Sequence, residues 1–236
     1  MSRIRQVIEK LFRPRLKPEQ LTRMSPAAVF EAIYRQNAWN GGESISGKGS
    51  DLQQTAYIAV ELPKVLKELG ARSILDIPCG DFFWMRHVFL DGIDYIGADI
   101  VDDLVFKNKA DENDRRSFRK CDLMTSELPS VDVIFCRDCL VHFSNKHVWQ
   151  TLGNIARSDA KYLMTTTFTL RSNDKSIETG QWRPLNLQAG PFNLPAPVSL
   201  IDEHCTQDDG QYPDKMLGVW SVESIRSVLS QHKQAA

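Results

Sequence analysis

From residue 72 onward, short apolar runs alternate with segments whose apolar residues repeat at helical spacing. The runs have the length and β-branched content of buried strands, and they span residues 73–77, 94–100, 117–123, 131–136 and 161–168. The predicted helices between them span residues 82–90, 101–110 and 145–157. Strands that alternate with helices predict βαβ units, and therefore a parallel α/β sheet with helices on both faces. Two further strands, 198–205 and 215–222, follow each other across a polar turn, which predicts an antiparallel pair at the end of the sheet.

The region before this alternation is predicted to be helical. Ser25 is a suitable N-cap for a helix over residues 25–38. Residues 39–50 contain four glycines and three serines and predict a loop. A second helix is predicted over residues 51–69, and Pro63 is expected to kink or divide it.

The net charge of −1 conceals two oppositely charged parts. Residues 1–24 carry a charge of +5 and the remainder carries −6, and so acidic a body argues against nucleic acid as a partner. The apolar residues of the basic part repeat at helical spacing and are Ile4, Val7, Ile8, Leu11 and Phe12. This pattern predicts an amphipathic helix that makes a contact through residues 1–20. One expected target is the anionic inner surface of the cell membrane. The alternative target is a protein surface, either on the chain's own domain or on a second subunit. A mitochondrial presequence is a further alternative.

The chain is therefore expected to comprise an N-terminal extension, residues 1–24, and a single domain, residues 25–236. Within that domain, residues 25–70 supply helices and a lid loop, and residues 71–225 form the catalytic core. The cysteines number five, and this odd number, together with the lack of a signal peptide, predicts a reducing, cytoplasmic location. No apolar run reaches ~18 residues, so no membrane-spanning helix is expected.

Acidic residues follow three successive predicted strands at a constant spacing. Asp76, Asp99 and Asp122 are each 23 residues apart. Ligands of doubly wound sheets bind beyond the carboxyl ends of the strands, so these carboxylates are expected to face one ligand. Gly80 lets the backbone approach that ligand closely, and an acidic residue about 20 positions later suits the two hydroxyls of a ribose. The turn lacks the G-x-G-x-x-G pattern, which argues against NAD and a dehydrogenase.

Two other motifs are interpreted as structural. Residues 42–48 match the G-x-x-x-x-G-K part of a phosphate-binding loop, but the next residue is Gly49 and not the required Ser or Thr. A helix is also predicted before this segment, where such a loop needs a strand. A lid with glycine hinges and serine donors fits residues 39–50 better, and a plain exposed linker is the alternative. Cys136 and Cys139 have no second pair with which to form a zinc site, so they are expected to be packing residues. The lid residues expected to contact the ligand are Ser46, Gly47 and Ser50.

Four segments resemble the successive motifs of class I S-adenosylmethionine-dependent methyltransferases, over roughly residues 50–225. They read LDIPCGD, YIGADI, KCDLMTSELPSVDVIFCRDCLVHF and YLMTTTF. The first corresponds to the D-x-G-x-G-x-G signature of that family, with two of its three glycines replaced. The resemblance implies a Rossmann-like three-layer sandwich with a seven-stranded, mostly parallel sheet whose last strand is antiparallel.

The same resemblance implies S-adenosylmethionine as the cofactor. Asp76 and Gly80 would border its methionine portion, and Asp99 would hold the ribose. Arg137 is a candidate to contact the cofactor's carboxylate, with a surface ion pair as the alternative. Ile100 and Leu123 would sandwich the adenine, with Asp122 near its amino group.

Methyl transfer to a hydroxyl group needs a base to remove its proton. His142 is the candidate base, and Asp138 would orient its imidazole or share the proton if both lay on one helical face. A capping or packing histidine is the alternative. The long irregular segment 171–197 is expected to recognise the acceptor. Candidate acceptor contacts are Trp182, Arg183, Asn186, Glu203 and His204, of which the last two are also candidates to hold a metal ion together with Asp138.

The sequence WNGGESISGKGSDLQQT joined to LDIPCGDFFWM is similar to a narrower bacterial subgroup associated with surface-glycan and natural-product biosynthesis. The expected function is therefore O-methylation of a carbohydrate-like or other polar acceptor, either a small molecule or a glycan. One alternative is methylation of a lipid-linked or aromatic acceptor. Another is a catalytically silent cofactor-binding subunit that activates a partner.

Overall fold

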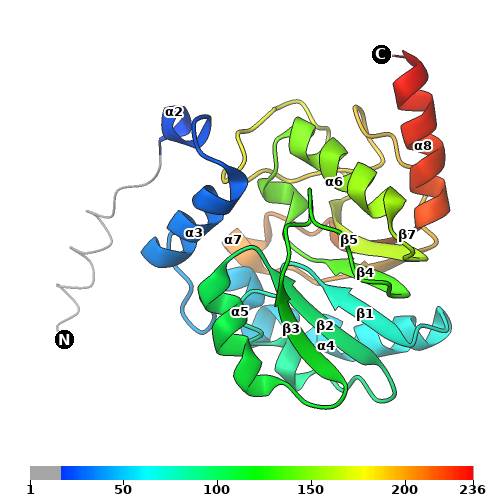
Figure 1. The fold of residues 1–236 in the computed structure, drawn as a ribbon. Coiled ribbons are helices and arrows are strands. Elements are labelled where there is room, and N and C mark those ends of the chain that lie inside the picture. Colours follow the sequence, from blue (N-terminus) through cyan, green and yellow to red (C-terminus); the bar gives the residue numbers. More distant parts are fainter. Residues whose placement is uncertain (1–16, 236) are drawn as a thin grey trace.

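The computed structural model describes residues 17–235. The strands of this part of the chain form one seven-stranded sheet in the order β3-β2-β1-β4-β5-β7-β6 (Figure 1). Their bounds are β1 Ser73–Asp76, β2 Asp94–Asp99, β3 Arg116–Lys120, β4 Val133–Cys136, β5 Tyr162–Phe168, β6 Ser199–Asp202 and β7 Lys215–Ser221. Strands β1 to β5 pair in parallel, whereas β7 runs antiparallel to both of its neighbours, β5 and β6. The predicted parallel sheet and its late antiparallel pair are confirmed.

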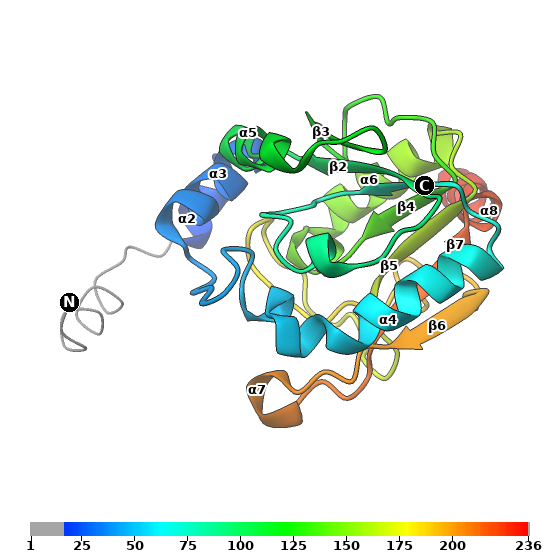
Figure 2. The same cartoon turned by 90° about the horizontal axis from the view of Figure 1, so that it is seen from below.

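Helices cover both faces of the sheet. Helices α4 (Leu52–Glu68) and α5 (Asp102–Asn108) contribute to one buried cluster, and α6 (Asn145–Arg157) and α8 (Val222–Ala235) contribute to the other. Side chains of the central strands alternate between the two clusters and are buried on both faces, as parallel sheets require. In Figures 1 and 2, α4 lies on the opposite side of the sheet from α6 and α8. This is the predicted three-layer arrangement.

Helices α2 (Pro18–Leu21) and α3 (Pro26–Gln36) precede the sheet. The hydroxyl of Ser25 accepts a hydrogen bond from the amide of Ala28 at 3.3 Å, so α3 begins at its predicted cap. Val29 of α3 packs so closely on Gly180 that a Cβ atom there would overlap it. This contact holds α3 against the loop that follows β5. The predicted amphipathic helix at residues 4–12 lies outside the described residues.

The structure differs from the sequence prediction in several helical segments. Residues 82–90 do not form a helix, and only Met85–His87 make a short 3-10 turn. Phe82 has a φ of 55°, a left-handed conformation that cannot begin a helix. Pro63 does not divide α4, which runs unbroken because its buried face packs on the sheet and overrides the cost of the proline. Helix α8 was not predicted. No helix in residues 17–235 has the length and apolar character to cross a bilayer.

Candidate active site

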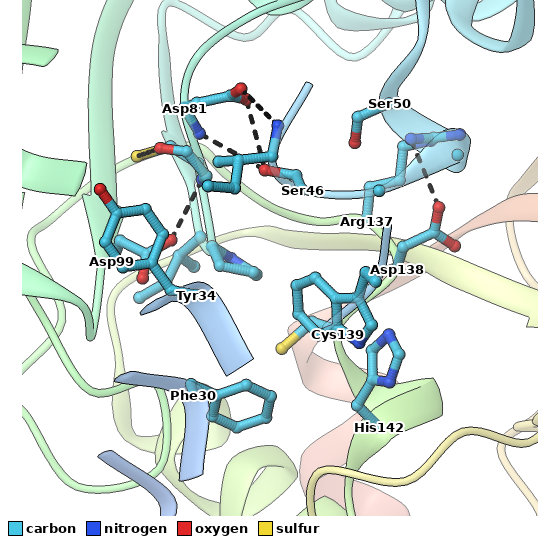
Figure 3. Close-up of a pocket in the computed structure, with 18 of the residues that line it drawn as sticks. Phe30, Tyr34, Ser46, Ser50, Asp81, Asp99, Arg137, Asp138, Cys139 and His142 are labelled. Carbon is cyan, nitrogen blue, oxygen red and sulfur yellow. Dashed lines mark hydrogen bonds and ion pairs between the residues drawn. The ribbon is translucent and has the colours of Figure 1, made fainter. Parts of the chain in front are cut away.

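The carboxyl ends of the parallel strands open into a cavity of about 670 Å³. This volume is typical of sites for cofactors and small molecules. Figure 3 shows Asp99 on one side of it and Asp138 and His142 on the other. The cavity brings together most of the residues predicted from the sequence. Those that line it are Ser46, Gly47, Ser50, Asp76, Gly80, Asp99, Ile100, Asp122, Leu123, Arg137, Asp138, His142 and Trp182.

Asp99 ends β2 and its side chain is held by two backbone amides. Its Oδ2 accepts from the amide of Gly80 at 3.1 Å, and its Oδ1 accepts from the amide of Val101 at 2.9 Å. Burial raises the pKa of Asp99 to about 6, although these donors act in the opposite direction. A carboxylate oxygen can accept more than one hydrogen bond. Asp99 therefore keeps the capacity to accept from two ligand hydroxyls.

Asp76 ends β1 and lies beside Asp99 in the wall of the cavity. Its Oδ2 accepts from the hydroxyl of Tyr95 at 2.6 Å. Burial, reinforced by the charge of Asp99, raises the pKa of Asp76 to about 7 against the effect of the Tyr95 hydrogen bond. Near neutral pH this carboxyl group is thus divided between its protonated and ionised forms, and a cationic ligand would favour the ionised form.

Gly80 forms the tight turn between these two carboxylates. Its φ is 54°, and a Cβ atom at this position would collide with the hydroxyl of Ser46. The carbonyl of Gly80 accepts from Nδ2 of the buried Asn108 at 2.8 Å. Only glycine satisfies both the backbone conformation and the close approach of the lid loop.

The loop that contains Ser46 is docked on Asp81. The carboxylate of Asp81 accepts from the hydroxyl of Ser44 at 2.8 Å, the amide of Ile45 at 2.9 Å and the hydroxyl of Ser46 at 3.3 Å. Figure 3 shows Asp81 and Ser46 joined in this way at the edge of the pocket. The loop therefore lines the cavity and is fastened at its edge, and its role as a lid stays a prediction.

The wall next to Asp99 is formed by Ile100 and the buried Leu123. Asp122 also lines the cavity, but both its oxygens hold the turn after β3. Its Oδ1 accepts from the amide of Met124 at 2.9 Å, and its Oδ2 accepts from the hydroxyl of Thr125 at 2.8 Å. Asp122 thus holds the turn that carries Leu123, and its carboxylate oxygens retain lone pairs for a ligand amine.

Four charged residues form a network at the far side of the cavity. Arg137 donates from Nε at 3.1 Å and from a terminal nitrogen at 2.6 Å to Oε2 of Glu203. Lys215 donates to Oδ2 of Asp138 at 2.8 Å and lies 3.3 Å from Oε2 of Glu203. We call Arg137, Asp138, Glu203 and Lys215 the charged quartet. Arg137 is buried, so its ion pair with Glu203 is not the surface pair of the alternative, and its contact with the cofactor's carboxylate stays a prediction.

Only Asp138 of the charged quartet has a substantially exposed side chain, at 27%, whereas the other three are at most 5% exposed. Burial alone would raise the pKa of Asp138, but the charges of Lys215 and Arg137 outweigh it and lower the pKa to about 2. Asp138 is therefore ionised throughout the physiological range and cannot take up a proton as a base. Oε1 of Glu203 is buried with no hydrogen-bond partner among the described residues, a costly arrangement in a purely structural ion-pair network.

His142 lies in the 3-10 turn Leu140–His142 and stacks on Trp39, with 4.8 Å between ring centroids. Its Nδ1 is 2.9 Å from the carbonyl oxygen of Gln181. A carbonyl only accepts, so Nδ1 carries the proton of the neutral ring and Nε2 keeps a free lone pair. Burial lowers the pKa of His142, which makes Nε2 an unprotonated acceptor at neutral pH.

The predicted partnership of Asp138 with His142 is wrong in its geometry. Asp138 has a φ of 51° and does not begin an α-helix, so the two side chains do not share a helical face. The residue that orients the imidazole is instead Gln181, through its backbone carbonyl. Asp138 acts on His142 only through its charge, which favours the protonated ring.

Of the predicted acceptor contacts, only Trp182 lines the cavity. The buried guanidinium of Arg183 donates to the carbonyl of Phe143 at 2.6 Å, and the amide nitrogen of Asn186 donates to the carbonyl of Arg171 at 2.9 Å. Both side chains therefore brace the irregular segment 171–197 rather than face the cavity. This bracing corrects the expectation that they meet the acceptor.

The remaining two predicted acceptor residues also lie outside the cavity lining. Glu203 supports the cavity wall through Arg137 and Lys215, and His204 is largely exposed and packs edge-on against Tyr57. Within residues 17–235, no group of three or more His, Cys, Asp or Glu side chains is arranged to hold a metal ion. The possible metal set of Asp138, Glu203 and His204 is thus not assembled.

All five cysteines are free and buried, as expected for packing residues. Cys139 nevertheless lines the cavity, as does Cys79. Several cavity residues were missed at the level of sequence, among them Trp39, Asp81 and Lys215. Lys215 begins its strand, whereas the strand-based candidates lie at the carboxyl ends of strands. An antiparallel strand brings its first residue to this edge, which is the signal that could have identified Lys215.

No protein-family profile matches the sequence, and no curated protein does. Among solved structures, the fold is similar to that of the Burkholderia thailandensis 1,6-didemethyltoxoflavin-N1-methyltransferase with bound 1,6-didemethyltoxoflavin and S-adenosylhomocysteine. That match has a TM-score of 0.58 and 15% identity and covers 88% of this chain and 91% of that one. PigF with S-adenosylhomocysteine gives a TM-score of 0.56 and 17% identity, covering 82% and 62%.

The human N-acetylserotonin methyltransferase in complex with S-adenosylmethionine gives a TM-score of 0.48 and 13% identity, covering 71% of this chain. The chain spans about half of that enzyme, 49% of its length. At these identities a comparison establishes a similarity of fold alone. The seven-stranded sheet with helices on both faces is a Rossmann-like fold, similar to that of the 1,6-didemethyltoxoflavin-N1-methyltransferase and of PigF.

Proposed function

We propose that this chain transfers a methyl group from S-adenosylmethionine to a hydroxyl group of a polar, carbohydrate-like acceptor. The observation that carries the proposal is the pairing of two groups across one cavity. Asp99 offers free carboxylate lone pairs at the end of β2, and His142 offers an unprotonated Nε2 on the opposite wall. The first suits a ribose and the second suits a hydroxyl that must lose its proton.

The residues of the cavity fit the cofactor in size and chemistry. A volume of about 670 Å³ accommodates a nucleoside with a side chain and a second small molecule. Asp99 would accept from the ribose hydroxyls, Ile100 and Leu123 would flank the adenine, and Asp122 would accept from its amino group. The partly protonated Asp76 suits a cofactor that carries a positive charge. When bound, S-adenosylmethionine supplies a methyl group made electrophilic by its sulfonium sulfur.

The chain's own residues would activate and enclose the acceptor. Nε2 of His142 takes the proton of the acceptor hydroxyl, while Nδ1 keeps its hydrogen bond to the carbonyl of Gln181. The negative charge of Asp138 favours the imidazolium that results. The lid loop, fastened to Asp81, excludes water from the reacting groups.

An acceptor with a flat apolar face is favoured by the aromatic side of the cavity. Trp182 and Tyr212 contact each other there with ring centroids 5.1 Å apart, and both line the cavity with Trp39. Such a wall stacks on the apolar face of a sugar ring. It would equally stack on an aromatic acceptor, which is the second candidate, but the charged quartet beside it provides hydrogen-bonding capacity that suits a polyol better.

Calorimetric titration with S-adenosylmethionine, S-adenosylhomocysteine and NAD tests the cofactor. We expect both sulfur nucleosides to bind and NAD not to bind, and the reverse would refute the proposal. Methyl glycosides and phenols then serve as acceptors, with S-adenosylhomocysteine release as the readout. His142→Ala should keep its affinity for S-adenosylhomocysteine and lose about 10²-fold or more in turnover. His87→Ala, a histidine outside the cavity lining, is the matched control and should retain both.

A further inference from the structure

We infer that Asp138 and Lys215 form a donor–acceptor pair that selects acceptors with two neighbouring hydroxyl groups. This inference deepens the proposed function and rests on it. Both residues line the cavity, and Figure 3 shows Asp138 on the same side as His142. Lys215 lies there too, because its ammonium is bonded to Asp138. The pair would thus meet the acceptor next to the hydroxyl that is methylated.

The hydrogen bonds of the pair leave one acceptor and one donor unused. Oδ2 of Asp138 is taken by Lys215 at 2.8 Å, while Oδ1 has only a weak contact of 3.4 Å from the hydroxyl of Thr166. The ammonium of Lys215 has three N–H donors. Two of them are directed to Asp138 and Glu203, which leaves a third for a ligand.

The pair is held rigidly from behind. The amide of Asp138 donates to the hydroxyl of Thr166 at 2.8 Å, which fixes the backbone in its left-handed conformation. Residues kept in sparsely populated conformations cluster at binding and catalytic sites. The buried side chains of Arg137 and Glu203 contact Asp138 and Lys215, respectively, and each neutralises the charge of its partner. The positions of both polar groups are therefore set before an acceptor arrives.

The charge balance decides which ligand chemistry fits. The charged quartet contains two cations and two anions, so it is neutral as a whole and offers little net attraction to an ionic acceptor. Adjacent hydroxyls can donate one hydrogen bond to Oδ1 of Asp138 and accept one from Nζ of Lys215. A single hydroxyl would satisfy only one of these two groups, and the other would stay desolvated and unpaired.

The test measures binding of matched acceptors to the protein saturated with S-adenosylhomocysteine, in which no transfer occurs. The probes are methyl hexopyranosides, each compared with its monodeoxy analogues, together with catechol and phenol. The wild-type protein should prefer at least one diol over its monodeoxy analogue or phenol by about tenfold or more. Equal binding within every pair, or no binding of any diol, overturns the inference.

Variants separate selection from a merely structural role. Asp138→Asn and Lys215→Met should each abolish the preference for the diol while keeping the affinity for S-adenosylhomocysteine. Lys161→Met is the matched control, since Lys161 forms an ion pair with Asp132 at 2.7 Å and does not line the cavity. It should keep the preference. A retained preference in both Asp138→Asn and Lys215→Met would contradict the inference.

A charge-balanced variant guards against misfolding. If Lys215→Met alone does not fold, the double variant Lys215→Met with Glu203→Gln removes one cation and one anion and keeps the network neutral. It should bind S-adenosylhomocysteine and show no preference for the diol, and a kept preference would overturn the inference. Failure of the wild-type protein to bind S-adenosylhomocysteine would instead refute the proposed function, and the diol pairs can then be titrated against the protein alone.

Discussion

Replacing Asp76 by asparagine should stabilise the protein at neutral and alkaline pH and have less effect at acid pH. The pKa of this carboxyl group is raised by burial from its usual 3.8 to about 7. Below 3.8 the folded and unfolded chains are both protonated, and the carboxyl group costs nothing. Between pH 3.8 and about 7 the carboxyl group is ionised in the unfolded chain but still protonated in the folded one, so the free energy of unfolding falls as the pH rises. Above about pH 7 Asp76 is ionised in both states, and the destabilisation of the folded protein is at its full, constant value.

The expected size of the effect follows from the pKa difference. One pKa unit corresponds to about 1.4 kcal/mol, so the full cost of ionised Asp76 is ~4 kcal/mol as an upper estimate. About 1.6 kcal/mol of it is already present at pH 5, by the same relation. The advantage of Asp76→Asn should therefore grow by ~2.5 kcal/mol between pH 5 and pH 8. Asparagine keeps an oxygen that can accept from Tyr95, so packing is preserved.

Urea denaturation of the ligand-free protein, followed by tryptophan fluorescence at several pH values, measures this difference. Asp94→Asn is the matched control because Asp94 begins the neighbouring strand β2 and its side chain is 66% exposed. That variant should show no pH-dependent change relative to the wild-type protein. A difference for Asp76→Asn that stays flat from pH 5 to pH 8 would show that Asp76 is already ionised at pH 5, contrary to the argument.

Three further outcomes are expected. Asp81→Ala should weaken S-adenosylhomocysteine binding by ~1–3 kcal/mol and speed hydrogen exchange in the lid loop, and unchanged exchange would show that Asp81 does not fasten the loop. Gly80→Ala should destabilise the fold by ~1–3 kcal/mol in thermal unfolding, because of its positive φ and the contact with Ser46; Gly42→Ala, where a Cβ meets nothing, is its control. The turnover rate at saturating substrates should fall only below pH 6.5, where His142 becomes protonated, since burial lowers its pKa from the usual 6.5. A pH–rate profile whose acid side is centred above pH 7 would exclude His142 as the base.

The sheet could be predicted from the sequence because its central strands are buried on both faces. The continuous apolar run 133–136 is typical of a buried strand. Helix α6 was predicted with its observed bounds, Asn145–Arg157. The segment 82–90 has the same apolar content, but its side chains fill space between layers from an irregular backbone. Periodicity alone does not distinguish these two cases.

The carboxylates of the cavity were predictable because each lies at the end of a parallel strand or just after it. Asp76, Asp99 and Asp122 reach one edge through topology alone. The opposite wall depends on tertiary contacts that leave no local pattern. Arg183 and Lys215 are both basic residues of the last third of the chain, yet one braces a loop and the other enters the cavity. Only the direction and neighbours of β7 distinguish them.

The antiparallel strand β7 also governs when the site can come into existence. It is inserted between β5 and β6, and it carries Lys215 to residues that precede it by almost 80 positions, as in its bond to Asp138. Contacts so distant in sequence form late, because the loops between them must close first. The wall of the cavity that holds Asp138 and Lys215 therefore forms only when residues 199–221 have joined the sheet. Formation of this polar wall is thus coupled to completion of the hydrophobic core, to which β7 also contributes.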